Sequence, residues 1–172
     1  VRAMDTVQTL MQDKGPINAF VVSGGSKRGW TSWLSAAVDA RVVAIVPCVI
    51  DVLNMSPQMK HHHQAYGSYS QAIKDYVQKK IFERFDTPEG QKLLEIVDPY
   101  AYRERYTLPK FMINSTGDQF FLPDSSQFYF NNLPGDKYLR YCPNTDHGLD
   151  DSGAEQSLLA FYQSILRDQA RP

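Results

Sequence analysis

The chain has 172 residues, of which 42% are apolar and 22% charged, values typical of a globular domain that buries one sizeable core. Its 18 basic and 19 acidic residues nearly cancel, which argues against a broad electrostatic surface for nucleic acid or anionic lipid. The expected partner is a small-molecule or peptide substrate. The best apolar run, residues 42–51, is shorter than the roughly 18 residues of a membrane span, so no span is expected.

The first fifty residues alternate between helical and strand patterns. Residues 1–13 carry apolar side chains at helical spacing and are followed by a Gly-Pro stop signal. A β-branched and aromatic run at 17–23 predicts a strand, and a helical stripe over 27–39 predicts the next helix. The segment 41–50 is almost continuously apolar, which is typical of a parallel strand that helices bury on both faces.

The sequence becomes polar and rich in tyrosine between residues 61 and 106. Helical windows at 69–85 and 88–96, without a strand pattern, predict an inserted helical lobe over 61–106. We expect this lobe to cap the site and set its specificity, although ordinary packing also explains its tyrosines. The tyrosines are Tyr66, Tyr69, Tyr76, Tyr100, Tyr102 and Tyr106.

Alternation resumes after the lobe. Strands are predicted at 108–114 and 137–141, with a helical segment at 124–132 between them and a closing amphipathic helix at 154–167. Strands that alternate with helices predict one α/β domain over residues 1–172, with a mostly parallel sheet flanked by helices. Functional groups in such folds collect beyond the carboxyl ends of the strands.

The strongest local signal is a serine in a glycine-rich, predicted strand-to-helix turn. Such a turn exposes a serine oxygen above the sheet, so Ser26 is the candidate nucleophile, and the Lys27 N–H is the candidate oxyanion donor. Gly24 provides a small neighbour, but the second glycine of the usual G-x-S-x-G pattern comes one residue late, at Gly29. The alternative is a structural or anion-binding turn in which Ser26 caps the helix. The spacing of a phosphate-binding loop is absent.

A hydroxyl nucleophile needs a base, and histidine is the usual one. His147 follows the last predicted strand and is the candidate base. The other three histidines, His61, His62 and His63, form a run in a polar segment. Adjacent side chains point in different directions, so an exposed lobe surface explains the run better than a weak metal site. We expect neither a metal nor a cofactor.

The acid that orients the histidine should lie between the serine and the histidine in the chain. Asp118 fits best, because it follows the strand predicted at 108–114 and a turn of small residues. Asp124 is the alternative acid, although it also resembles a helix N-cap. Asp146 and Asp51 stay open as further possibilities.

Two cysteines, Cys48 and Cys142, have neither the C-x-x-C spacing nor the paired histidines of a zinc site. Buried thiols and a single disulfide both remain open.

Three sequence blocks surround the candidate residues: GGSKRGWT at 24–31, GDQFFLPDS at 117–125 and PNTDH at 143–147. With these blocks the chain resembles, over nearly its whole length, the PhoPQ-activated pathogenicity-related protein family, which includes autocrine proliferation repressor proteins of amoebae. The resemblance implies the C-terminal part of a larger α/β-hydrolase fold. It also implies export to a periplasmic, secreted or endomembrane location, although the chain shows no targeting signal.

The resemblance further implies that a missing N-terminal half, or a partner chain, covers the sheet edge beside the strand before Ser26. An α/β hydrolase takes a second oxyanion donor from a loop after an earlier strand, which has no counterpart here. Losing one donor typically costs about 2.7–4 kcal/mol of transition-state stabilisation, so we expect weak or absent activity from these residues alone.

Two functions are therefore open. One is serine hydrolysis of an ester or amide through a triad of Ser26, Asp118 and His147. The other is an exported signalling or binding protein that keeps a hydrolase fold without its chemistry, since fold alone does not determine function.

Overall fold

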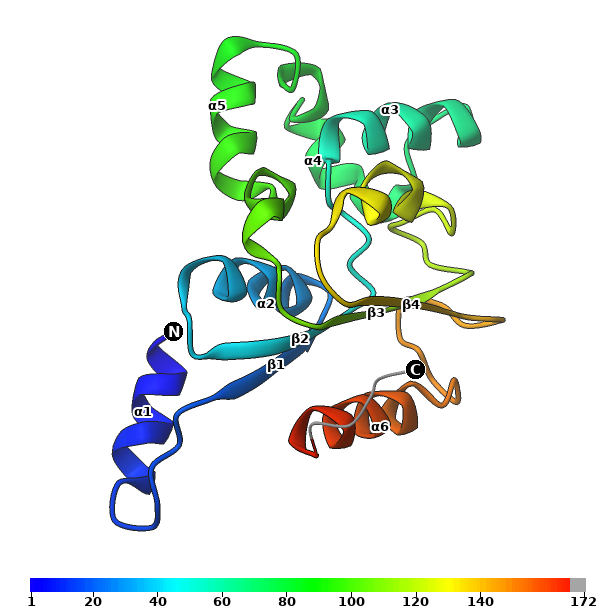
Figure 1. Cartoon of the computed structure of the whole chain (residues 1–172). Coiled ribbons are helices and arrows are strands. Elements are labelled where there is room, and N and C mark those ends of the chain that lie inside the picture. Colours follow the sequence, from blue (N-terminus) through cyan, green and yellow to red (C-terminus); the bar gives the residue numbers. More distant parts are fainter. Residues whose placement is uncertain (168–172) are drawn as a thin grey trace.

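A computed structural model describes residues 1–167 and contains a four-stranded sheet (Figure 1). Its strands are β1 Phe20–Gly25, β2 Val42–Cys48, β3 Lys110–Ser115 and β4 Lys137–Cys142, in the order β1-β2-β3-β4. Every neighbouring pair is parallel, which confirms the predicted α/β class. The carboxyl ends of all four strands therefore meet at one edge of the sheet.

The helices lie on both faces of this sheet. They are α1 Arg2–Met11, α2 Lys27–Val38, α3 Met55–Tyr66, α4 Lys74–Gln78, α5 Pro88–Val97 and α6 Ala154–Leu166. Figure 1 shows α2 and the lobe formed by α3, α4 and α5 on one side of the sheet, and α6 on the other. Within residues 1–167, no helix combines the length and the apolar character needed to cross a bilayer.

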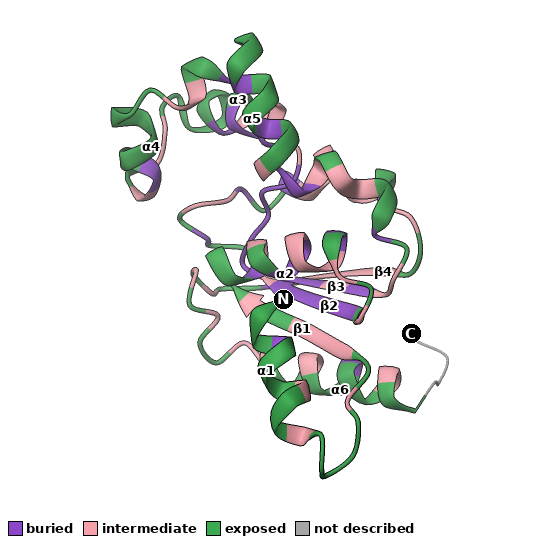
Figure 2. Ribbon diagram, turned by 90° about the vertical axis from the view of Figure 1, so that its left-hand side faces the viewer, coloured by how far each residue is buried: buried purple, intermediate pink, exposed green. Residues whose placement is uncertain are grey.

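The core follows from the apolar run of β2, whose successive side chains point to opposite faces of the sheet. Ile45 packs in a cluster with Trp33 of α2, whereas Val46 packs in a second cluster with Phe161 of α6. All but one of the residues Val42–Pro47 of β2 are buried, and Figure 2 shows β2 and β3 largely buried. This burial explains why the segment lacks the polar alternation of a half-exposed strand.

The strand before Ser26 lies at the edge of the sheet. Within the described residues β1 pairs only with β2, and Val21 and Val22 are half-buried (Figure 2). This is the sheet edge that the family resemblance implies, and an apolar edge of this kind favours pairing with a further strand.

The lobe differs in detail from its prediction. Its first helix, α3, begins at Met55, six residues before the expected start of the lobe at His61. The helix expected at 69–85 is interrupted: short 3₁₀ turns at Gln71–Ile73 and Phe82–Arg84 flank the single α-helical turn of α4. One cause is Lys80, whose left-handed conformation (φ 52°) follows α4 and prevents its continuation.

The helix predicted at 124–132 is also wrong. The segment forms two 3₁₀ turns, Ser125–Phe128 and Phe130–Asn132, with the buried Tyr129 between them. The Tyr129 hydroxyl donates to the Asp51 carboxylate, so a tertiary contact prevails over helical periodicity here.

Hydrogen bonds hold the lobe together and attach it to α2. The buried Asp98 carboxylate accepts the backbone N–H groups of Met55 at 2.7 Å and of Tyr100 at 2.9 Å, and so joins the start of α3 to the end of the lobe. The Trp30 indole of α2 donates to the Val97 carbonyl oxygen at 2.8 Å. Helix α2, which begins directly after Ser26, is therefore also in contact with the lobe.

Candidate active site

The turn between β1 and α2 holds Ser26 in a strained conformation. Its φ of 55° and ψ of −125° are unusual for a residue with a side chain and cost on the order of 1–3 kcal/mol. The Ser26 N–H donates to the Cys48 carbonyl oxygen at 2.9 Å, which ties the turn to β2. The Ser26 side chain makes no capping hydrogen bond, so the helix-cap explanation does not account for this serine.

Gly29 lies one residue later than the second glycine of the G-x-S-x-G pattern, but it provides the close packing that the pattern requires. A Cβ on Gly29 would lie 2.5 Å from Ile50 Cγ2 and 2.7 Å from the Gly24 oxygen. A Cβ on Gly24 would lie 2.7 Å from the Arg28 backbone carbon. The side chain of Arg28 is free to point outward, because Gly29 is the residue of α2 that faces the crowded contact.

Asp118 and His147 lie together at the carboxyl ends of β3 and β4. Asp118 Oδ2 is 2.8 Å from His147 Nδ1, and the Asp118 side chain is only 2% exposed. Because an ionised carboxylate only accepts hydrogen bonds, Nδ1 carries the proton and Nε2 of the neutral ring keeps its lone pair. Asp118 Oδ1 also accepts the Phe120 N–H at 2.7 Å, which fixes the carboxylate plane.

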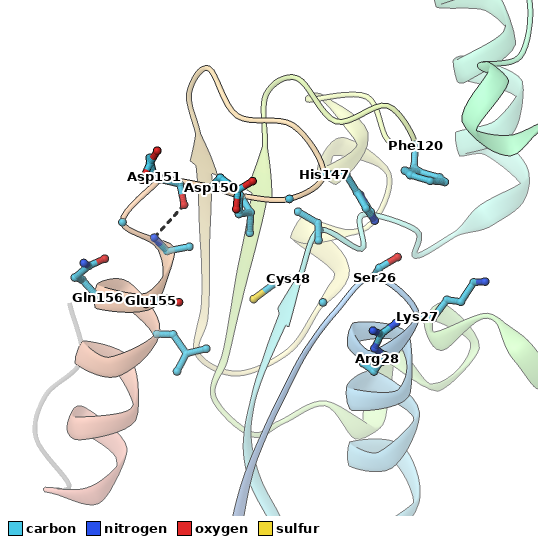
Figure 3. A pocket seen from close by; sticks show the side chains of 18 residues that line it. Ser26, Lys27, Arg28, Cys48, Phe120, His147, Asp150, Asp151, Glu155 and Gln156 are labelled. Atoms are coloured by element: carbon cyan, nitrogen blue, oxygen red, sulfur yellow. Dashed lines mark hydrogen bonds between the residues drawn. The ribbon is translucent and has the colours of Figure 1, made fainter.

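Ser26 and His147 line the same open pocket, which has a volume of about 910 Å³. Figure 3 shows the Ser26 hydroxyl and the His147 ring pointing toward one another. Among residues 1–167 no hydrogen bond joins the two side chains. Catalytic hydrogen bonds are often long without substrate and shorten when it binds.

The loop after β3 that carries Asp118, here called the acid loop, contacts the loop after β4 that carries His147, the histidine loop. These direct contacts set the Asp118–His147 geometry. The Gly117 N–H donates to the Thr145 oxygen at 2.9 Å, and a Cβ on Gly117 would lie 2.8 Å from that oxygen. The His147 N–H donates to Gln119 Oε1 at 3.2 Å. The sequence alone indicates no role for Gln119 or Thr145, because their contacts join loops that are distant in the chain.

Side chains of opposite charge line different parts of the pocket. Lys27 and Arg28 lie on the α2 side, near Ser26, whereas Asp150, Asp151 and Glu155 lie toward α6 (Figure 3). The Lys27 N–H belongs to the first turn of α2, where backbone donors have no acceptor within the helix. This donor is therefore free to bind an anion beside Ser26.

Phe120 and Cys48 complete the surroundings of the two central residues. The Phe120 ring packs 4.4 Å from the His147 ring, centroid to centroid, and shields it on one side. Cys48 also lines the pocket, but burial raises the pKa of its thiol to about 11. This thiol is neutral near pH 7 and is a poor nucleophile compared with a thiolate. Both Cys48 and Cys142 are free thiols, so the disulfide alternative is wrong.

The other candidate acids have different partners. Asp124 Oδ2 lies 2.9 Å from His61 Nε2, and the Asp124 side chain caps no helix. Asp146 Oδ1 accepts the Gly148 N–H at 2.7 Å and closes a local turn. Asp118 is the carboxylate in contact with the His147 ring.

Asp51 belongs to a buried polar cluster beside the acid loop. The residue is 1% exposed, and its two carboxylate oxygens accept the Tyr129 hydroxyl at 2.5 Å and the Tyr141 hydroxyl at 2.6 Å. Burial raises the pKa of Asp51 to about 6, the tyrosine hydrogen bonds oppose this rise, and the charge of Asp118 adds to it. An acid at the end of a continuous apolar strand was the one sequence signal for this cluster.

The three histidines of α3 do not gather around a metal. The described residues contain no group of three or more His, Cys, Asp or Glu side chains that could hold one. His61 contacts Asp124, whereas the buried His62 accepts the Ser70 N–H at 3.1 Å. His63 packs on Tyr69.

The sequence profile of the PhoPQ-activated pathogenicity-related proteins matches residues 1–172. The chain belongs to this family. Another relative is the autocrine proliferation repressor protein A of Dictyostelium discoideum, which is 43% identical over 177 residues. The alignment covers 100% of this chain and 36% of the relative, so this family member spans about a third of that protein's length.

Solved structures similar to this PhoPQ-related chain are α/β hydrolases. An acetyl xylan esterase from Paenibacillus sp. R4 superimposes with a TM-score of 0.69 at 19% identity, over 95% of this chain and 50% of the esterase. An acylaminoacyl peptidase of Pyrococcus horikoshii gives 0.72 at 13% identity, over 98% and 27%. The α/β hydrolase MGS-M2 from a deep-sea metagenome gives 0.54 at 16%, over 98% and 71%. At these identities the likeness shows the fold alone, and that fold is the α/β hydrolase fold.

Proposed function

We propose that this family member is a metal-independent serine hydrolase that cleaves an ester or amide bond of a small-molecule or peptide substrate. The observation that carries the proposal is the 2.8 Å contact between buried Asp118 and His147, in the pocket that also contains the strained Ser26. A nucleophile, a base and an orienting acid are the three parts of a serine-hydrolase triad.

Each group has a distinct role in the proposed reaction. His147 Nε2 takes the Ser26 proton as the serine oxygen attacks the carbonyl carbon, and Asp118 stabilises the imidazolium that forms. His147 then gives its proton to the leaving alcohol or amine, and an acyl-enzyme remains on Ser26. His147 then takes a proton from water as the water oxygen attacks the acyl carbon. The bond between the acyl carbon and Ser26 Oγ breaks, His147 returns the proton to Oγ, and the acid leaves.

The Lys27 N–H is the proposed oxyanion donor, because it is the backbone amide directly after the nucleophile. One donor supports the reaction less well than two, and removing a donor typically lowers the rate by about 10²–10³. We therefore expect residues 1–172 alone to turn over slowly. A longer form that supplies a donor beside β1 should be faster by about this factor.

A second candidate function comes from the repressor relative. That Dictyostelium discoideum protein is named an autocrine proliferation repressor, and it is 43% identical to this chain. Under this alternative, the protein is exported and binds a partner through the same pocket without chemistry. Export is part of both proposals.

A fluorophosphonate probe separates the two functions, because it reacts covalently with an activated serine. We expect labelling of the wild-type protein and none of Ser26→Ala. Ser23→Ala is a matched control, because the Ser23 hydroxyl already donates to the Val46 oxygen at 2.9 Å. Labelling that survives Ser26→Ala would refute the nucleophile assignment, whereas absence of wild-type labelling would favour the binding function.

A further inference from the structure

The histidine run of α3 distributes its side chains among different neighbours, since successive helical residues point about 100° apart. His61 Nε2 contacts the Asp124 carboxylate at 2.9 Å, and the His63 ring meets the Tyr69 ring at 4.9 Å between centroids. His62 turns inward and is only 2% exposed. A buried ring nitrogen without a hydrogen-bond partner destabilises the folded state, so buried histidines are usually hydrogen-bonded.

The partner of His62 is the turn that follows α3. The Ser70 N–H donates to His62 Nε2 at 3.1 Å. A ring nitrogen that accepts a hydrogen bond carries no proton, so this contact requires the neutral imidazole. A protonated ring would place a second N–H against the Ser70 N–H and break the contact.

The surroundings of His62 favour this neutral form. Burial lowers the pKa of His62, and the neighbouring His61 and His63 lower it further. The rings of Tyr66 and Tyr69 pack on the His62 ring, with centroids 5.0 Å and 6.0 Å away.

Ser70 connects this contact to the acid loop. The Ser70 hydroxyl donates to the Gln119 carbonyl oxygen at 2.7 Å, and Gln119 directly follows Asp118 in the chain. The side chain of the same glutamine accepts the His147 N–H at 3.2 Å through Oε1. Three successive hydrogen bonds thus lead from His62 in the lobe to the backbone of His147.

We propose that His62 is a positioning residue for the candidate active site: its neutral ring holds Ser70, and Ser70 holds Gln119 between the loops of Asp118 and His147. The inference deepens the proposed function and rests on it for its consequence in catalysis. The lobe must be docked for His147 to keep its place. Protonation of His62 in acid releases Ser70 and loosens the His147 loop.

Amide hydrogen exchange on the intact protein tests the connection without any need for activity. His62→Phe fills the space but offers no acceptor, whereas His62→Gln offers an uncharged acceptor. At neutral pH we expect His62→Phe to lower the protection of the Ser70 and His147 amides about fivefold, and His62→Gln to keep it. The same measurement is made in mild acid, with each exchange rate corrected for the intrinsic rate at that pH. The wild type should then lose this protection, and His62→Gln should keep it.

His63→Phe is the matched control, since it makes the same change one residue along the helix. Its His147 amide should exchange as in the wild type, and amides of β2 should be unchanged in all variants. The proposal is overturned if His62→Phe leaves the His147 amide protected, or if His63→Phe exposes it equally.

The rate at which the fluorophosphonate probe labels Ser26 tests the consequence of the proposal for catalysis. It should fall in His62→Phe and recover in His62→Gln, and its decline in acid should be smaller in His62→Gln than in the wild type. If the wild type is not labelled at all, the proposed hydrolysis fails, while the exchange data still decide whether His62 positions the His147 loop.

Discussion

Replacing Asp51 with asparagine should change how the stability of the protein depends on pH. The Asp51 carboxyl is 1% exposed, and burial raises its pKa from 3.8 to about 6. The folded state therefore binds a proton more tightly than the unfolded chain does. The stabilisation from this proton is fully present below the unfolded pKa and is lost as the pH rises through the folded pKa.

The size of the effect follows from the shift. One pKa unit corresponds to about 1.4 kcal/mol, so the change from 3.8 to about 6 corresponds to about 3 kcal/mol. Asparagine has nearly the same shape, and its amide can still pair with the hydroxyls of Tyr129 and Tyr141, but it does not titrate. The free energy of unfolding of the wild type, minus that of Asp51→Asn, should fall by about this amount between pH 3.5 and pH 7.

Urea unfolding, followed by the fluorescence of Trp30 and Trp33, measures both proteins at each pH. Taking the difference cancels the titration of the other carboxyl groups to first order. A difference that stays flat between pH 4 and pH 6.5 would refute the assignment of a raised pKa to Asp51. A difference that grows with pH would mean that the tyrosine hydrogen bonds outweigh burial.

Three further predictions follow from the geometry. Gly29→Ala should destabilise the fold by at least about 1–3 kcal/mol, because its Cβ would lie 2.5 Å from Ile50 Cγ2; an unchanged urea midpoint would contradict this. Asp118→Asn should lower kcat by up to about 10⁴-fold with little change in KM, and Asp124→Asn by less than about tenfold; the reverse order, measured with an ester substrate, would exchange their roles. Lys110 is buried with a pKa lowered to about 8, chiefly by burial, so the stability of the wild type relative to Lys110→Met should rise from about pH 8 to pH 10.5; a constant difference in urea unfolding would argue against it.

The sequence predicted the strands and the site loops because their signals are local. The continuous apolar run of β2 is the direct consequence of burial on both faces, and all four strands begin and end within a few residues of their predicted bounds. The helices expected at 69–85 and 124–132 were not recovered. The left-handed conformation of Lys80 ends α4, and the Tyr129 hydroxyl binds the distant Asp51 carboxylate; periodicity contains neither feature.

The sequence predicted the Asp118–His147 pair but not the contacts around it. Their order in the chain and their places after β3 and β4 indicated a pair, since parallel strands bring their carboxyl ends to one edge. The preference over Asp124 rested on chain position and on the resemblance of Asp124 to a helix N-cap. The contact of Asp124 with His61 is visible only once α3 lies against the loop after β3. Gln119 lies in the family block at 117–125, but nothing in the sequence indicated its contact with His147.

The sequence by itself determined the α/β class, the four parallel strands, the family and the strand-to-helix turn at Ser26, because each depends on neighbouring residues or on a run of apolar side chains. The tertiary structure alone decided that Gly29 carries the close packing, that Asp51 binds two tyrosine hydroxyls, and that His62 reaches the His147 loop through Ser70 and Gln119. These features join residues far apart in the chain. Hydrogen bonds and steric contacts act over a few ångströms, so only the folded arrangement can select such partners.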